Sequence, residues 1–124
     1  MELDDVTEKI IGCAYKVSNT LGAGFLEKVY ENALAIELRK SGLDVKQQHH
    51  LPVFYDDEQV GDFYADLLVE NSVIVELKAV KMLVPEFSAQ VINYLKASKL
   101  ETGLLINFGK PKIEIKRLFG KPKF

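Results

Sequence analysis

Apolar residues recur at spacings of three and four along the first third of the chain, which is the periodicity of amphipathic helices. The pattern predicts one helix over residues 3–20, followed by the sequence GAG at 22–24, and a second helix over about 25–40. Gly42 lies just beyond the second helix, where glycine commonly adopts the left-handed conformation that ends a helix. We therefore expect the N-terminal region to consist of two consecutive helices.

The period then changes to that of strands. The segments at 45–57, 60–69 and 72–80 are rich in β-branched and aromatic residues and are separated by turn-forming residues, which predicts three antiparallel strands in a meander. Pro85 suits the first turn of a helix, and the apolar spacing continues it to about residue 99. GLLINFG at 103–109 and KIEIKRLF at 112–119 complete the predicted order ααβββαββ.

Length and composition bound the class of protein. A chain of 124 residues fits one domain, over 1–124, and 48% hydrophobic with 27% charged residues excludes disordered and fibrous classes. Cys13 is the single cysteine, so no internal disulfide can form, which favours a reducing compartment such as the cytoplasm. The apolar runs are short, and we expect no membrane insertion.

Charge is distributed unevenly. The formal net charge is −2, yet residues 110–124 are strongly basic and the rest of the chain is acidic. This basic segment is either a solvated edge or a strip that contacts phosphates. Its basic residues are Lys110, Lys112, Lys116, Arg117, Lys121 and Lys123.

The predicted strand at 72–80 contains charged residues within an apolar run. Because strand side chains alternate between faces, Glu76 and Lys78 share one face of this strand. A three-residue loop at 70–72 would place Asp66 of the preceding strand directly opposite Glu76. The sequence therefore predicts that two carboxylates and one ammonium group converge.

Two interpretations of this cluster remain open on the residues alone. Lys78 could form a structural ion pair with Glu76 or with Asp66 on a half-exposed face of the sheet. Alternatively, the two carboxylates, which repel each other at short range, could be compensated by a divalent cation. The second interpretation predicts a functional site.

The spacing D-x9-E-x-K of Asp66, Glu76 and Lys78 resembles the active-site signature of the PD-(D/E)XK nuclease superfamily. The chain has Ala65 at the position of the proline in that name. The helix after the predicted strand resembles the Gln-x-x-x-Tyr helix of one branch of these nucleases, through Gln90 and Tyr94.

A second resemblance lies in GFLEKVYENAL at 24–34. It matches the Gly-x-x-Glu-x-x-Tyr signature of the small GxxExxY proteins, which belong to the same superfamily, through Gly24, Glu27 and Tyr30. The resemblance extends from about residue 4 to 119, and the chain is identified as a member of this family on these motifs. It implies an α/β (α+β) fold with a restriction-endonuclease-like core, in which helices flank a mixed β-sheet.

The resemblance also implies a mechanism, namely Mg²⁺- or Mn²⁺-dependent hydrolysis of phosphodiester bonds. Asp66 and Glu76 are then the main metal ligands, the Leu77 backbone carbonyl is a third, and Glu27 contributes directly or through water. Lys78 would orient the attacking water or stabilise developing negative charge. The catalytic set is thus Asp66, Glu76, Lys78 and Glu27.

The expected partner is nucleic acid, with DNA preferred to RNA, and a homodimer stays open. The alternative is a catalytically inactive module of the same fold that binds nucleic acid or a protein. Tyr30 also has the simpler interpretation of a packed aromatic residue. Substrate contacts are expected from Gln90, Tyr94, Tyr30, Lys112, Lys116 and Arg117.

Overall fold

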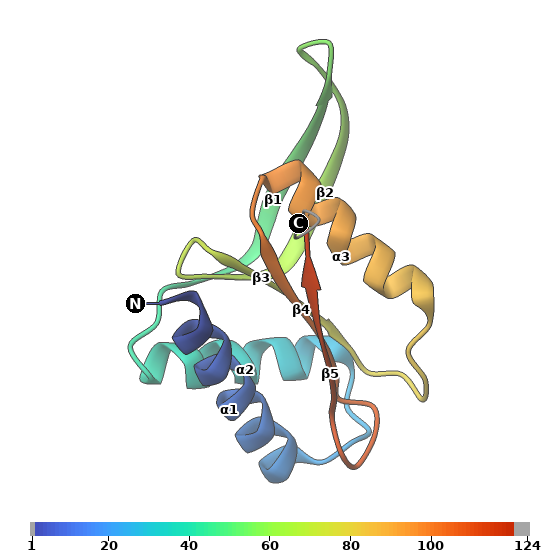
Figure 1. Cartoon of the computed structure of the whole chain (residues 1–124). Coiled ribbons are helices and arrows are strands. Elements are labelled where there is room, and N and C mark those ends of the chain that lie inside the picture. Colours follow the sequence, from blue (N-terminus) through green and yellow to red (C-terminus); the bar gives the residue numbers. More distant parts are fainter. Residues whose placement is uncertain (1, 121–124) are drawn as a thin grey trace.

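The computed structural model describes residues 2–120 and has the predicted order of elements, ααβββαββ (Figure 1). Where predicted and observed ends differ, they differ by one or two residues. Lys121 and Lys123, which belong to the predicted basic segment, lie outside the described residues. The elements are α1 (Leu3–Leu21), α2 (Glu27–Lys40), β1 (Val45–Tyr55), β2 (Glu58–Val69), β3 (Val73–Lys78), α3 (Pro85–Ser98), β4 (Thr102–Asn107) and β5 (Glu114–Phe119).

The five strands form one mixed sheet in the order β1-β2-β3-β4-β5. The pairs β1–β2 and β2–β3 are antiparallel, which confirms the predicted meander. Strand β4 runs parallel to β3, since α3 forms the crossover between them, and β5 returns antiparallel to β4. The chain therefore has the expected α/β (α+β) class, with a mixed sheet and helices.

Helices cover both faces of the sheet and create two apolar cores. The first core lies against α1 and α2 and contains Val73, Val75 and Leu77 of β3. The second core lies against α3 and contains Ile74, which lies between Val73 and Val75 in β3. This alternation is the expected consequence of the pleat, and it leaves Glu76 and Lys78 on the α3 side.

The β1–β2 hairpin is longer than the rest of the sheet and projects from it (Figure 1). Its pairing runs from Val45 opposite Val69 to Tyr55 opposite Glu58, whereas β2 pairs with β3 only over residues 67–69. We call the outer part of this hairpin, residues 49–65, the arm. The sheet therefore splits at the point where the arm leaves β3.

The arm begins at a kink in β1. Gln48 has a positive φ of 50°, which non-glycine residues seldom adopt, and its expected pairing with Asp66 is missing from the ladder. Val45 packs into the first core and Leu51 into the second, although a regular strand would place both on one face. The kink thus inverts the side-chain alternation of β1 opposite Asp66.

Candidate active site

The two strand carboxylates lie in the gap where the arm leaves β3. Val69 pairs with Val73, so the predicted register is confirmed, and the regular ladder ends with Leu67 opposite Val75. Beyond that point, Glu76 Oε1 accepts a hydrogen bond from the Asp66 backbone N–H at 2.7 Å. Asp66 Oδ2 accepts one from the Leu77 N–H at 2.9 Å. Each carboxylate therefore bonds to the backbone of the opposite strand.

Burial makes ionisation of this pair unfavourable. Glu76 is 4% exposed, and burial followed by the charge of Asp66 raises the pKa of its carboxyl to about 8. Burial also raises the pKa of Asp66, although the hydrogen bond from Leu77 acts in the opposite direction. Two neighbouring carboxyl groups with raised pKa values form a site that a cation would stabilise.

One oxygen of Glu76 is open to a ligand. Within residues 2–120, Oε2 of Glu76 accepts no hydrogen bond, whereas Oε1 is held by Asp66. Every fully buried side-chain nitrogen or oxygen in the described part of the chain has a hydrogen-bond partner, so Oε2 must reach solvent. An ion could therefore bind this oxygen without displacing a protein donor.

Lys78 lies beside the carboxylates and is held by α3. Its Nζ is 3.4 Å from Oε1 of Gln90 and 4.5 Å from the centre of the Phe87 ring. In the described part of the chain it forms no ion pair within 4.0 Å with Asp66 or Glu76, so the geometry of a structural ion pair is not observed. Its charge still lowers the pKa of Glu76.

Tyr94 extends the site along α3. The centre of its ring is 5.3 Å from the centre of the Phe63 ring on the arm. Burial, and then the charges of Glu76 and Asp66, raise the pKa of Tyr94 to about 12. Its hydroxyl therefore stays protonated at neutral pH and can donate a hydrogen bond.

Glu27 reaches the same electrostatic environment from α2. It is the first residue of that helix, where a carboxylate is favourable because of the helix dipole. Partial burial raises the pKa of Glu27, the charge of Lys78 lowers it, and the charge of Asp66 raises it. Gly24 precedes it with φ of 117°, a conformation that favours glycine.

Tyr30 lies inside the protein and not at the site. Its hydroxyl donates to the Gly22 carbonyl at 2.5 Å and accepts from the Phe25 N–H at 3.2 Å. Its ring is stacked on Phe108 with centres 4.8 Å apart, and the side chain is fully buried. The expected contact of Tyr30 with substrate does not fit this position, because the side chain shapes the loop before Glu27 instead.

Two residues that the sequence reasoning gave no role also belong to the site. Glu31 of α2 is 3% exposed and accepts a hydrogen bond from Gln48 Nε2 at 2.8 Å. The same Nε2 donates to Asp66 Oδ1 at 3.2 Å, so Gln48 joins the two acids. Glu31 also accepts from Gln47 and Lys28. A glutamine in a strand resembles a surface residue, and the sequence carries no signal for its left-handed backbone.

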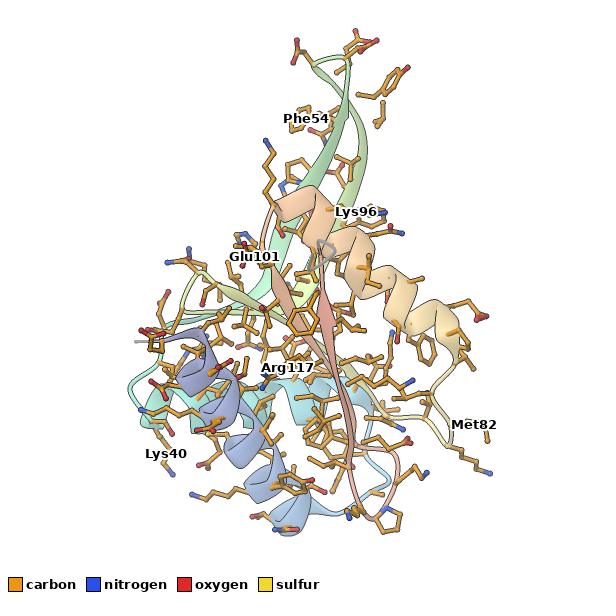
Figure 2. The ribbon with its side chains drawn as sticks, viewed as in Figure 1. Lys40, Phe54, Met82, Lys96, Glu101 and Arg117 are labelled. Atoms are coloured by element: carbon orange, nitrogen blue, oxygen red, sulfur yellow. The ribbon has the colours of Figure 1, made fainter. Side chains whose placement is uncertain are left out.

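The basic residues of β5 and its preceding loop point in different directions. Lys116 lies opposite Leu105, which lies opposite Glu76, so Lys116 shares a row of the sheet with the site. Lys112 is exposed in the loop between β4 and β5. Arg117 instead contacts α1 on the other face, as Figure 2 shows, where it donates to Thr7 Oγ1 at 2.8 Å and lies 3.5 Å from Asp4. The expected substrate contact of Arg117 does not fit this arrangement.

A sequence model of the PD-(D/E)XK nuclease superfamily matches residues 4–118. The chain belongs to this superfamily. The restriction-endonuclease-like core that the motifs implied agrees with this membership and with the observed sheet and helices. The finer assignment to the GxxExxY proteins is not tested by this match.

A solved structure shares the fold of this superfamily member. The crystal structure of SSO0001 superposes with a TM-score of 0.60 at 14% sequence identity and covers 78% of this chain. The chain spans about half, 52%, of that protein. No curated protein gives a significant match.

The donor set of this superfamily member fits a hydrated divalent ion. Within residues 2–120, no three His, Cys, Asp or Glu side chains form a complete metal site, but Asp66 and Glu76 form a pair. Mg²⁺ commonly binds one or two carboxylates and keeps several waters. The Leu77 N–H points at Asp66, and a strand residue directs its N–H and C=O to the same side, so the Leu77 carbonyl faces the same gap.

Proposed function

We propose that this chain is a metal-dependent nuclease that hydrolyses phosphodiester bonds of nucleic acid. The observation that carries this proposal is the pair Asp66 and Glu76 in the gap between β2 and β3, with the Lys78 ammonium held beside them. Membership of the PD-(D/E)XK nuclease superfamily supports the reaction class. The match of Gly24, Glu27 and Tyr30 to the GxxExxY signature supports the finer assignment.

In this proposal Asp66, Glu76 and the Leu77 carbonyl would hold Mg²⁺ or Mn²⁺, with Glu27 contributing through a water. Such an ion would supply a water of lowered pKa and would polarise a phosphoryl oxygen. The carboxylates must be ionised to bind it, and their raised pKa values favour binding at neutral to alkaline pH.

Lys78 of β3 and Tyr94 of α3 supply a positive charge and a hydrogen-bond donor beside the carboxylates. Lys78 is positioned by Gln90 and Phe87 and is not neutralised by a close carboxylate, so its charge is available to the attacking water or to the phosphoryl group. The protonated Tyr94 hydroxyl can donate to a phosphate oxygen. Both groups flank the carboxylates on the α3 side of the sheet.

The proposed partner is nucleic acid, DNA in preference to RNA, approached with the help of Lys112 and Lys116. None of the helices in residues 2–120 is both long and apolar enough to cross a membrane. We further propose that the protein acts in the cytoplasm, where its free Cys13 remains reduced.

The test compares wild type with Lys78→Ala and Asp66→Asn on single-stranded DNA, duplex DNA and RNA, with Mn²⁺, Mg²⁺ or a chelator. We expect metal-dependent cleavage that is lost in Asp66→Asn and lowered about 100-fold or more in Lys78→Ala, with little change in substrate affinity. Equal cleavage by all three proteins would identify a contaminating nuclease. Absence of cleavage on every substrate would contradict the proposal and favour the inactive binding module.

A further inference from the structure

A groove lies between the arm and the C-terminal end of α3, next to the proposed active site. It has a volume of about 490 Å³, which is within the range of known ligand sites. Figure 2 shows Phe54 on the arm and Lys96 on the end of α3 nearest to it. The groove is lined by Pro52, Val53, Phe54, Phe63, Asn93, Lys96, Ala97 and Lys99.

The lining combines exposed aromatic rings with unpaired positive charges. Phe54 is 60% exposed and Phe63 is 39% exposed, so both rings are available to a ligand. Lys96 and Lys99 form no ion pair with any of the residues 2–120. None of the described residues that line the groove is acidic. The groove therefore suits an anion that also presents flat apolar faces.

The acidic residues of the arm lie elsewhere. Asp56, Asp57 and Glu58 are at its tip, in and next to the turn. Asp62 pairs with His50 and also accepts from Gln59. Because none of these carboxylates lines the groove, its positive charge is not cancelled locally.

Helix α3 connects the groove to the candidate active site. Phe63 lines the groove and lies 5.3 Å from Tyr94, measured between ring centres. Gln90 lies one helical turn before Tyr94 on α3, and its Oε1 is 3.4 Å from the Lys78 ammonium of the candidate active site. A polymer seated in the groove could extend from Phe54 past Tyr94 to the carboxylates.

We propose that this groove binds a single-stranded segment of nucleic acid and guides it to the carboxylates, an inference that rests on the proposed function. Unpaired bases expose the faces that stack on Phe54 and Phe63, whereas a duplex hides them inside its own stack. Lys96 and Lys99 contact the phosphates of the same segment. The arm therefore binds the single-stranded nucleic acid, and β3 and α3 carry the residues that act on it.

The test measures binding of labelled oligo(dT) and of a duplex by fluorescence anisotropy in chelator, so that cleavage cannot interfere. We expect Phe54→Ala to weaken binding of oligo(dT) about tenfold and to change duplex binding much less. The double variant Lys96→Ala/Lys99→Ala should weaken binding and flatten the plot of log affinity against log salt by about 1.4, which corresponds to two phosphate contacts on a single strand.

Two matched controls make this test specific. Tyr55→Ala removes a neighbouring aromatic ring that is 70% exposed but does not line the groove, and Lys9→Ala removes an exposed charge on α1. Both should bind oligo(dT) within about twofold of wild type. Wild type that does not bind oligo(dT), a Phe54→Ala protein that binds like Tyr55→Ala, or an equal loss of duplex binding would each overturn the proposal.

Failure of the groove and failure of the proposed function give different results. If binding depends on Phe54 but no substrate is cleaved with metal, the groove stands and the nuclease proposal fails. If wild type cleaves while Phe54→Ala and Lys96→Ala/Lys99→Ala bind as well as wild type, the nuclease proposal stands and the groove is refuted.

Discussion

The environment of Glu76 differs strongly from that of a free carboxylate. Its folded pKa is about 8 against an ordinary value of 4.5, so the folded protein binds this proton more tightly than the unfolded chain. The associated stability is fully present below pH 4.5 and is lost as pH rises through 8. Without metal, the free energy of unfolding should therefore fall across this window.

The variant Glu76→Gln should remove most of that pH dependence, since an amide has no proton to lose. At pH 8 and in chelator, we expect its free energy of unfolding to exceed that of wild type by about 4 kcal/mol. Urea unfolding at several pH values measures both effects. The control Glu58→Gln removes an exposed carboxylate at the tip of the arm and should keep the wild-type slope. If the free energy of unfolding of Glu76→Gln had the same pH dependence as that of wild type, burial of Glu76 would not be the cause of that dependence.

Gln48 permits a second prediction at the level of one residue. Glycine usually destabilises a strand relative to alanine, but Gln48 has a positive φ that disfavours any side chain. Gln48→Gly should therefore be more stable than Gln48→Ala by about 1 kcal/mol, although both lose the hydrogen bonds to Glu31 and Asp66. The neighbouring Gln47 is not among the residues with positive φ. At that position Gln47→Ala should therefore be more stable than Gln47→Gly. Urea denaturation of the four variants tests this, and the same order at both positions would contradict the kink.

At the scale of elements, the connection from α1 to α2 positions Glu27, and Tyr30 holds that connection. Tyr30→Phe removes one hydroxyl that donates to Gly22 and accepts from Phe25 inside the protein. Loss of these bonds should lower the free energy of unfolding by about 1–2 kcal/mol. The control Tyr15→Phe alters an exposed hydroxyl on α1 and should have little effect. Equal stability of wild type and Tyr30→Phe would mean that the loop is fixed by other contacts.

The split of the sheet is also a property of elements and not of single residues. Strand β2 pairs with β3 over residues 67–69 only, and the arm then continues with β1 alone. The missing ladder bonds are replaced by the side chains of Asp66 and Glu76. The site therefore exists because two strands separate while their backbone N–H groups still need acceptors.

For the whole molecule, metal binding should be visible as a change in stability. An ion that binds only the folded protein adds about 2.7 kcal/mol to the free energy of unfolding when its concentration is 100 times its Kd. Thermal unfolding of wild type should therefore shift upward with Mn²⁺ or Mg²⁺, and the shift should vanish in Asp66→Asn and Glu76→Gln. Asp62→Asn, which alters an acid of the arm, should keep the shift. Identical melting curves with metal and with chelator would argue against the site.

The sequence by itself determined the order of the elements and the register of the central hairpin. Helical and strand periodicities are local properties, so ααβββαββ could be predicted with ends that differ by one or two residues. A three-residue turn at 70–72 fixes Val69 opposite Val73 and brings Asp66 to Glu76. The convergence of Asp66 and Glu76 could be predicted for the same reason, because the two residues lie on consecutive strands.

Only the tertiary structure decided which other side chains reach the carboxylates. Arg117 shares a basic segment with Lys116, but strand alternation sends it to Thr7, 110 positions earlier in the chain. Gln48 contacts Asp66 because its backbone is left-handed, which no local sequence pattern encodes. Lys78 contacts Gln90 because α3 packs on that face of the sheet. Side-chain direction within a paired sheet depends on kinks and on neighbouring elements, and these arise from long-range packing that sequence periodicity does not contain.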